Sequence, residues 1–251
     1  MSRVMIVGAG PGDPELITVK GLRAIQEADV IFYDRLAAPE LLQEAAPGTE
    51  LVYCGKEPGR HSMSQEELNS RLILEAAKGR RVTRLKGGDP FIFGRGGEEA
   101  DVLQQAGIAY DIVPGITSGA AVPAYAGIPV THRDYASSVT FVAGVSKAQD
   151  SEYWRHAAKA SDTLCIYMGI RSLPEITRHL IRHGRDGSTP AAVIQEGTTA
   201  RQKTITGTLD TIAGKLHEVE QPAMVVIGDV VKLGEQLAWF EAAARPAEVV
   251  G

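Results

Sequence analysis

Charged and hydroxyl side chains follow the apolar runs of this sequence, at the points where strands are expected to end. Asp34 and Arg35 come after the run at 30–33, and Thr117 and Ser118 come after the run at 109–113. Open α/β sheets bind ligands outside the carboxyl ends of their strands, so we expect these residues to line one cleft between two domains. Their types indicate a ligand with both apolar and charged parts.

The stretch at 84–99, RLKGGDPFIFGRGGEE, is the strongest feature of this kind. Glycine costs backbone entropy, so this concentration of glycines indicates a main chain that approaches something closely. Flexible linkers are rich in glycine and serine and seldom contain Phe-Ile-Phe. We therefore interpret the stretch as a binding loop between a strand and a helix. Lys86, Asp89 and Arg95 give it donors, an acceptor and positive charge.

Composition is typical of a globular protein with one large or two ordinary domains. The 251 residues are 44% hydrophobic and 23% charged. No apolar run reaches bilayer-spanning length, and the amino terminus enters a predicted strand without the layout of a signal peptide. Cys54 and Cys165 lack metal-ligand spacing, so we expect no metal site, no disulfide framework and a cytoplasmic location. The formal net charge of −5 argues against general nucleic-acid binding.

Strands and helices alternate over the first part of the chain. We predict strands at 4–7, 30–33, 50–53, 81–85 and 109–113, with helices near 19–28, 41–45, 64–77 and 98–105. The third helix opens on a Ser-x-x-Glu capping box, from Ser64 to Glu67. The alternation predicts a mostly parallel sheet with helices on both faces.

Small residues dominate 119–129, and we place a domain junction there. The predicted domains are an amino-terminal α/β domain at 1–118 and a carboxyl-terminal α/β domain at 119–245. Polar and apolar residues alternate at 203–208, as in a half-exposed antiparallel strand, so the second sheet is predicted to be mixed. Its other strands are predicted at 138–143, 163–168, 191–194 and 223–227, with helices at 174–183 and 209–219.

The loop GAGPGDP at 8–14 invites a dinucleotide-binding interpretation. The fingerprint G-x-G-x-x-G requires a third glycine where Asp13 stands. Pro11 also removes a backbone donor from the turn that would hold a pyrophosphate. NAD binding is therefore the weaker interpretation of this loop.

Basic residues in this acidic chain are concentrated in loops rather than on helix faces. Arginine is suited to bidentate recognition of carboxylate and phosphate groups. The set favours a polyanionic small substrate, and it comprises Arg35, Lys56, Arg60, His61, Lys86, Arg95, His132 and Arg133.

Several long segments together resemble the tetrapyrrole methylase family. They occur in family order over about residues 3 to 240 and include VGAGPGDPELIT, GKEPGRHSMSQEELN, RLKGGDPFIFGRGGEE, VPGITS, AGIPVTHRDYASSV and YMG. The resemblance implies two α/β domains with the active site in the cleft between them. It also implies a homodimer that binds a small tetrapyrrole and neither nucleic acid nor membrane. The implied reaction is methylation of uroporphyrinogen III at ring carbons 2 and 7 by S-adenosylmethionine, which gives precorrin-2 through precorrin-1.

Site residues follow from the same resemblance. Asp34 matches the proposed proton acceptor and Lys56 the proposed donor. We assign substrate carboxylates to Arg35, Arg60, Arg95 and Arg133 as a hypothesis. The residues that match the cofactor site are Pro11, Gly87, Gly88, Asp89, Ile92, Thr117, Ser118, Met168, Gly197 and Ala223.

Three alternatives remain open from the sequence. A methylase acting on a later corrinoid precursor would share the fold and the cofactor, although the THRDYASSV segment is not expected in it. A nicotinamide-dependent oxidoreductase is disfavoured by Pro11 and Asp13. A regulator that only binds tetrapyrrole would tolerate the loss of Asp34 and of the glycine loop, and both are present.

Overall fold

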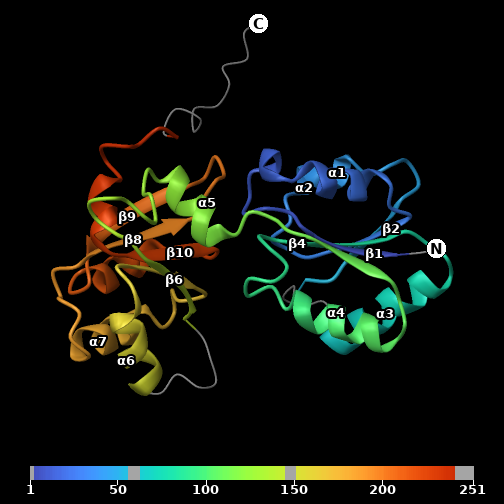
Figure 1. Cartoon of the computed structure of the whole chain (residues 1–251). Coiled ribbons are helices and arrows are strands. Elements are labelled where there is room, and N and C mark those ends of the chain that lie inside the picture. The colour runs from blue at the N-terminus through green and yellow to red at the C-terminus, as the bar shows by residue number, and fades with distance from the viewer. Residues whose placement is uncertain (1–2, 56–62, 145–150, 241–251) are drawn as a thin grey trace, which may run out of the picture. The chain divides into compact units, whose positions relative to one another are not determined.

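The computed structural model describes residues 3–55, 63–144 and 151–240. The chain divides into two compact units, Met1–Thr117 (unit 1) and Ser118–Gly251 (unit 2). Each unit contains one five-stranded sheet with helices packed on it (Figure 1). Among the described residues, no helix has the length and apolarity needed to cross a membrane.

Unit 1 is built on a fully parallel sheet. The strand order is β3-β2-β4-β1-β5, so the chain passes from β1 to β2 across a position that β4 later fills. Because all five strands are parallel, their carboxyl ends lie at one edge of the sheet. The strands are β1 (Val4–Gly8), β2 (Val30–Tyr33), β3 (Glu50–Tyr53), β4 (Val82–Lys86) and β5 (Tyr110–Val113).

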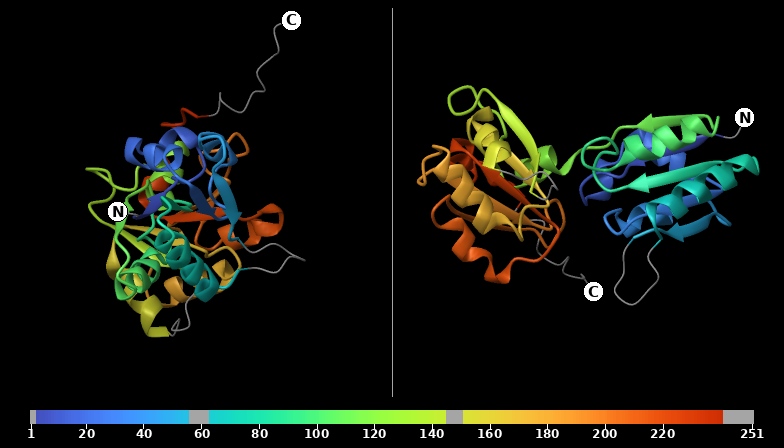
Figure 2. Two further views of the ribbon diagram at one scale, coloured as in Figure 1. Left: turned by 90° about the vertical axis from the view of Figure 1, so that its right-hand side faces the viewer. Right: turned by 90° about the horizontal axis from the view of Figure 1, so that it is seen from below.

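Helices cover both faces of the first sheet, as the alternation predicts. One core cluster joins Ile25 and Leu41 to β-strand residues, and a second joins Leu72 and Leu103 to the opposite face. Figures 1 and 2 show the two helix pairs on the two sides. The predicted capping box is present, because Ser64 Oγ accepts from Glu67 N at 3.1 Å. The elements are η1 (Pro14–Leu16), α1 (Val19–Gln26), α2 (Pro39–Gln43), α3 (Gln65–Ala77) and α4 (Gly96–Gln105).

Unit 2 has the mixed sheet that the sequence predicts. The order is β6-β7-β10-β8-β9, in which β6 and β7 are parallel and the remaining neighbours are antiparallel. The strands are β6 (Val139–Ala143), β7 (Thr163–Tyr167), β8 (Pro190–Gln195), β9 (Lys203–Thr208) and β10 (Ala223–Ile227).

The helices of unit 2 bury one face of this sheet and part of the other. Trp154 of α6 is 1% exposed and belongs to one core cluster with residues of α7 and η2. α5 lies on the opposite face, where Gly119 N donates to Tyr167 Oη at 2.8 Å. These elements are α5 (Ser118–Tyr125), α6 (Ser151–Ala160), α7 (Leu173–Arg182), η2 (Ile212–Glu218) and η3 (Asp229–Leu233).

Three helical segments differ from the sequence prediction. α6 has no counterpart in it. α5 occupies the stretch of small residues interpreted as a junction, where Pro123 stands inside the helix. The helix predicted at 209–219 is a 3-10 helix over Ile212–Glu218. The small residues of α5 give almost no amphipathic period, so packing on the sheet determines that helix. α6 is amphipathic, with Trp154 and Ala157 on its buried face, so its sequence did carry a helical signal.

Candidate active site

The loops that follow β1, β4 and β5 meet at the carboxyl edge of the first sheet. Gly88 N donates to Gly10 O at 2.6 Å, and Gly10 N donates to Gly88 O at 3.2 Å. A Cβ on Gly8 would lie 2.6 Å from both Gly115 Cα and Gly88 O. The glycines of this edge are thus required first by the close approach of the loops to one another. Pro11 follows directly on this contact.

Asp89 fixes the glycine loop to the loop after β5. Its Oδ1 accepts from Phe91 N at 2.8 Å, and its Oδ2 accepts from Gly115 N at 3.0 Å. Gly88 has φ +67°, a left-handed conformation that favours glycine. A Cβ on Gly87 would lie 2.4 Å from Leu36 Cβ, which brings the loop after β2 to the same edge. Ile92 N donates to Asp89 O at 3.4 Å, at the end of this turn.

Asp34 stands at this edge with both carboxylate oxygens positioned. Oδ1 accepts from Leu36 N at 3.0 Å. Oδ2 lies 3.5 Å from Arg84 Nη2, and the Asp34 side chain is 27% exposed. Arg84 donates through Nη1 to Phe32 O at 3.4 Å and to Leu85 O at 2.9 Å. The proposed proton acceptor is therefore held by a buried guanidinium that is itself fixed by two backbone carbonyls.

A buried charge cluster lies behind Asp34. Glu99 is fully buried, and its Oε1 accepts from Lys86 Nζ at 2.8 Å and from Arg84 Nε at 3.2 Å. Gln65 donates to the same oxygen at 3.2 Å, whereas Glu99 Oε2 has no partner among the described residues. Burial lowers the pKa of Lys86, and the neighbouring Arg84 charge lowers it further, against the opposing effect of Glu99. Two cations therefore share one buried anion, and the surplus positive charge faces Asp34.

Apolar side chains surround the polar groups of this edge. Their exposure is large for hydrophobic residues of a folded protein and indicates a binding surface. They belong to the loops after β2, β4 and β5: Leu36 (48% exposed), Phe91 (58%), Phe93 (44%) and Ile116 (39%).

The predicted basic residues of unit 1 differ in their surroundings. Arg35 is exposed beside Asp34. Arg95 has φ +60° and pairs with Glu98 through Nε (2.9 Å) and Nη2 (2.6 Å), so a ligand carboxylate would compete with Glu98 for it. Lys56 and Arg60, the predicted proton donor and a predicted substrate residue, lie outside the described residues.

Unit 2 brings its own predicted cofactor residues to one edge of its sheet. β10 runs antiparallel to β7 and β8, so its start at Ala223 lies beside Gln195 and beside the end of β7. Met168 follows β7 with φ +55° and is 50% exposed. A Cβ on Gly197 would lie 2.3 Å from Val122 Cγ1, so this loop fits tightly on α5.

Thr117 and Ser118 stand where one unit ends and the next begins. Thr117 is 9% exposed at the end of the loop that contains Gly115. Ser118 opens α5, whose second residue is bonded to the Tyr167 hydroxyl. Tyr167 is the last residue of β7 and immediately precedes Met168, so Ser118 lies near the Met168 edge of unit 2.

Arg133 is at the other edge of the second sheet. It lies in the loop before β6, and Ser137 and Ser138 of that loop are bonded to Asp162, which precedes β7. Met168 follows the opposite end of β7. The structure therefore does not bring Arg133 together with Met168, Gly197 and Ala223 within unit 2.

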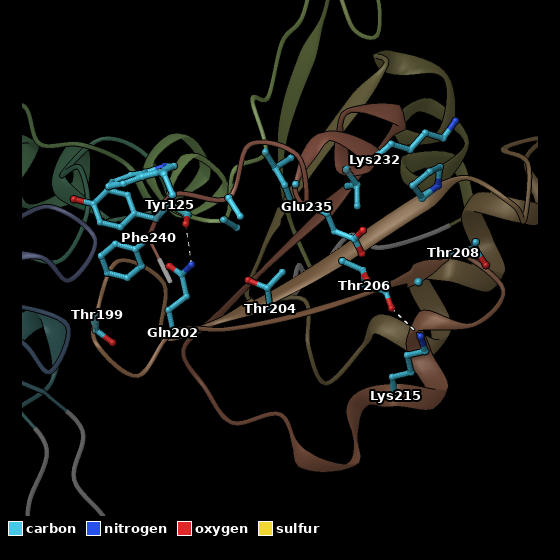
Figure 3. Close-up of a pocket in the computed structure, with 18 of the residues that line it drawn as sticks. Tyr125, Thr199, Gln202, Thr204, Thr206, Thr208, Lys215, Lys232, Glu235 and Phe240 are labelled. Atoms are coloured by element: carbon cyan, nitrogen blue, oxygen red, sulfur yellow. Dashed lines mark hydrogen bonds between the residues drawn. The ribbon is translucent and has the colours of Figure 1, made fainter. Parts of the chain in front are cut away.

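A groove of about 790 Å³ occurs elsewhere in unit 2 and contains none of the predicted site residues. Figure 3 shows threonines of β9 and the aromatic rings of Tyr125 and Phe240 along it. No group of three or more candidate metal ligands occurs in the described part of the chain.

Arg84 and Glu99 are functional candidates that the sequence reasoning did not single out. Arg84 and Lys86 are charged residues inside an otherwise apolar strand, and Glu99 is fully buried thirteen residues after Lys86. The charged residues inside an apolar strand were the signal that could have revealed this cluster, since charged groups are seldom buried without partners.

The chain matches known proteins over nearly its whole length. Its fold joins a parallel αβ unit, which has a glycine-lined carboxyl edge, to an αβ unit with a mixed sheet. The family model for Tetrapyrrole (Corrin/Porphyrin) Methylases matches residues 3–213. The chain belongs to this family, which confirms the resemblance seen in its sequence and the expected fold class.

The names of individual relatives are more specific than the name of the family. The chain is 56% identical to uroporphyrinogen-III C-methyltransferase of Priestia megaterium over 235 residues, which cover 92% of this chain and 99% of the relative. It is 52% identical to the Bacillus subtilis enzyme of the same name, covering 99% and 98%. A siroheme synthase of Stutzerimonas stutzeri is 48% identical over 97% of this chain and 53% of its own length.

Solved structures agree with these relatives. Uroporphyrin-III C-methyl transferase of Thermus thermophilus, complexed with S-adenyl homocysteine, superimposes with a TM-score of 0.79 at 40% identity and covers 92% of this chain and 99% of its own. A cobalt precorrin-4 methyltransferase has a TM-score of 0.81 at 29% identity and covers 91% and 95%.

Proposed function

We propose that this protein methylates uroporphyrinogen III twice, at ring carbons 2 and 7, with S-adenosylmethionine as methyl donor. The products are precorrin-1 and then precorrin-2. The observation that carries the proposal is identity of 52–56% over nearly the full length of relatives named for this reaction. The S-adenyl homocysteine complex of the Thermus thermophilus relative supports the choice of cofactor.

The residues at the two sheet edges fit a ligand of this chemistry. Main-chain groups of the glycine loop and the hydroxyls of Thr117 and Ser118 suit the polar adenosine and amino-acid parts. The exposed Met168 suits a flat apolar ring. Asp89 already accepts two backbone bonds, so we assign it the shaping of the loop. The full cofactor set remains Pro11, Gly87, Gly88, Asp89, Ile92, Thr117, Ser118, Met168, Gly197 and Ala223.

When bound, S-adenosylmethionine supplies an electrophilic methyl group to an electron-rich pyrrole carbon of the substrate. The protein's main task is to align donor and acceptor, which the rigid loops of unit 1 favour. Leu36 and Phe91 exclude water from the apolar parts of the reactants. Asp34 stabilises the positive charge that develops on the macrocycle and takes the proton that the macrocycle subsequently loses from another position, because the methylated ring carbon carries a side chain and no hydrogen. Arg84 holds Asp34 in place for this role.

Further proposals concern the residues that bind the substrate, the location of the protein and its domains. Arg35, Arg60, Arg95 and Arg133 bind substrate carboxylates, and Lys56 donates a proton. The protein acts in the cytoplasm as a homodimer, and two free cysteines are compatible with a reducing compartment. We retain 1–118 and 119–245 as domains, with the division into two compact units as support.

The experiment that tests this function separates binding from turnover. Asp34→Asn should bind S-adenosylmethionine in calorimetry as the unchanged protein does. Its methylation of uroporphyrinogen III without oxygen should fall about 100- to 10,000-fold, the usual effect of removing one positioned acid or base. Asp101→Asn, at an exposed position on α4, is the matched control and should keep full activity. Equal turnover in Asp34→Asn would refute the role of this carboxylate.

A further inference from the structure

Four side chains of alternating charge run from the interior of unit 1 to the carboxyl edge of its sheet. Lys86 Nζ lies 2.8 Å from Glu99 Oε1, and the same oxygen lies 3.2 Å from Arg84 Nε. Arg84 Nη2 lies 3.5 Å from Asp34 Oδ2. The side chains of Lys86, Glu99 and Arg84 are at most 6% exposed, whereas that of Asp34 is 27% exposed. Of the four groups, Asp34 is therefore the one that a ligand can reach.

Stability does not explain why these charges are buried. A buried ion pair is often no more stabilising than apolar residues of similar volume, because its charges lose their hydration. Glu99 Oε2 has no hydrogen-bond partner among the described residues. Burial and the Arg84 charge lower the pKa of Lys86, against the opposing charges of Glu99 and Asp34. The presence of this costly cluster beside Asp34 indicates a role in the chemistry of the site.

Each nitrogen of the Arg84 guanidinium has its own acceptor. Nη1 donates to Phe32 O (3.4 Å) and Leu85 O (2.9 Å), and Nε donates to Glu99 Oε1 (3.2 Å). Nη2 donates to Asp34 Oδ2. An arginine and a carboxylate otherwise favour a bidentate pair, in which two nitrogens face two oxygens. Because Glu99 occupies Nε and two carbonyls occupy Nη1, Arg84 has Nη2 alone for Asp34.

Asp34 consequently has one long ionic contact instead of a close bidentate pair. Its Oδ2 is 3.5 Å from Arg84, whereas a charge-assisted bond of this kind is ordinarily about 2.7–2.9 Å long. Its Oδ1 accepts from Leu36 N at 3.0 Å. The carboxylate is thus oriented from two sides and keeps lone pairs for a ligand. Loss of the acceptor at Arg84 Nε would free the guanidinium to pair closely with Asp34 and to draw its carboxylate away from the ligand.

We propose that Glu99 is a positioning residue for methyl transfer, which acts on Asp34 through Arg84. Glu99 holds the Arg84 guanidinium so that one nitrogen alone faces Asp34, and Lys86 supplies the second cation that keeps the buried Glu99 carboxylate charged. Glu99 is fully buried and does this without touching substrate or cofactor. This inference rests on the proposed function, because the role of Asp34 belongs to that reaction.

Two buried methionines test this role without leaving a buried charge unpaired. A variant that combines Lys86→Met with Glu99→Met replaces an ion pair by apolar side chains of similar length, which is often neutral or stabilising. Its Tm should therefore equal or exceed that of the unchanged protein. Its calorimetric affinity for S-adenosylmethionine should be unchanged, because neither replaced side chain is more than 4% exposed. Its kcat for methylation of uroporphyrinogen III should fall by about tenfold to a hundredfold, as expected when a reacting group is displaced by about 1 Å.

The same pair of changes in the Asp34→Asn protein distinguishes positioning from a general structural effect. Because Glu99 acts through Asp34, the two methionines should lower the residual kcat of that protein by less than about twofold. An equal fold-loss with and without Asp34, or an unchanged kcat in the stable methionine variant, would overturn the proposal. Glu27→Gln is the control, because Glu27 is exposed at the end of α1, ahead of β2, and it should leave kcat unchanged.

If the methionine variant does not fold, Glu99→Gln is measured with and without Asp34, at a temperature at which circular dichroism shows a folded protein. The neutral amide accepts a weaker bond from Arg84 Nε than the carboxylate does, so kcat should fall when Asp34 is present and stay nearly constant in the Asp34→Asn protein. Equal losses in the two proteins would again overturn the proposal. Failure of the proposed function is distinguishable, because the unchanged protein would then methylate no uroporphyrinogen III in the same assay.

Discussion

Replacement of Glu99 by glutamine tests the buried charge cluster behind Asp34. Glu99 is fully buried and is the shared anion of Lys86 and Arg84, at 2.8 and 3.2 Å. The glutamine keeps the shape but leaves buried Lys86 without a counter-charge and leaves Arg84 with only the longer contact to Asp34, at 3.5 Å. Removal of one partner from a buried ion pair costs about 3–5 kcal/mol. For a chain of this length that corresponds to a fall in Tm of roughly 6–20 °C.

Urea denaturation at constant m-value measures this loss as a free energy of unfolding. Glu98→Gln is the matched control, because Glu98 and its partner Arg95 are each 56% exposed and such pairs contribute about 0–1 kcal/mol. The pKa of Lys86 is already lowered by burial, so the deficit of Glu99→Gln should shrink as pH rises and the amine loses its proton. A loss below 1 kcal/mol, independent of pH, would refute the reasoning.

Three further predictions follow from particular contacts. Gly8→Ala should abolish cofactor binding in calorimetric titration, because its Cβ would lie 2.6 Å from Gly115 Cα. A Cβ on Gly97 would have no atom within 4 Å, so Gly97→Ala should stabilise α4 by about 0.5–1 kcal/mol in thermal unfolding. Asp89→Ala should weaken cofactor binding about tenfold or more and cost about 1–3 kcal/mol, because two backbone donors lose their acceptor, and unchanged affinity would contradict its shaping role. The hydrogen bonds from Arg81 hold the pKa of Asp29 at about 2, below its ordinary 3.8. The stability that this carboxylate contributes above pH 4 should therefore be lost as pH falls through 2. In Asp29→Asn the free energy of unfolding should depend less on pH over this range.

Much of the fold was predictable because strand patterns in unit 1 are short, apolar and regularly spaced. The prediction at 30–33 matches β2, and the register of parallel strands then places Asp34 at the carboxyl edge. The capping box before α3 was equally readable, because a side-chain oxygen and a backbone donor three residues later form a local contact.

The remaining features depend on contacts that are distant in sequence. Arg84 and Glu99 become partners only when β4 and α4 pack, and no periodicity signals such a pair. The glycines at 8, 88 and 115 proved to be packed on one another, which spacing alone does not reveal. Arg133 was grouped with the other loop arginines by residue type, yet the pairing of β6 with β7 places it at the far edge of its sheet.

The mass of the product tests the proposed double methylation of uroporphyrinogen III most directly. Purified protein is incubated without oxygen with uroporphyrinogen III and isotopically labelled S-adenosylmethionine. We predict a product heavier by two labelled methyl groups, with a singly methylated species appearing first. Binding of the cofactor without any methylation of uroporphyrinogen III would contradict the proposed substrate and indicate a later corrinoid precursor. Failure to bind S-adenosylmethionine would contradict the account as a whole.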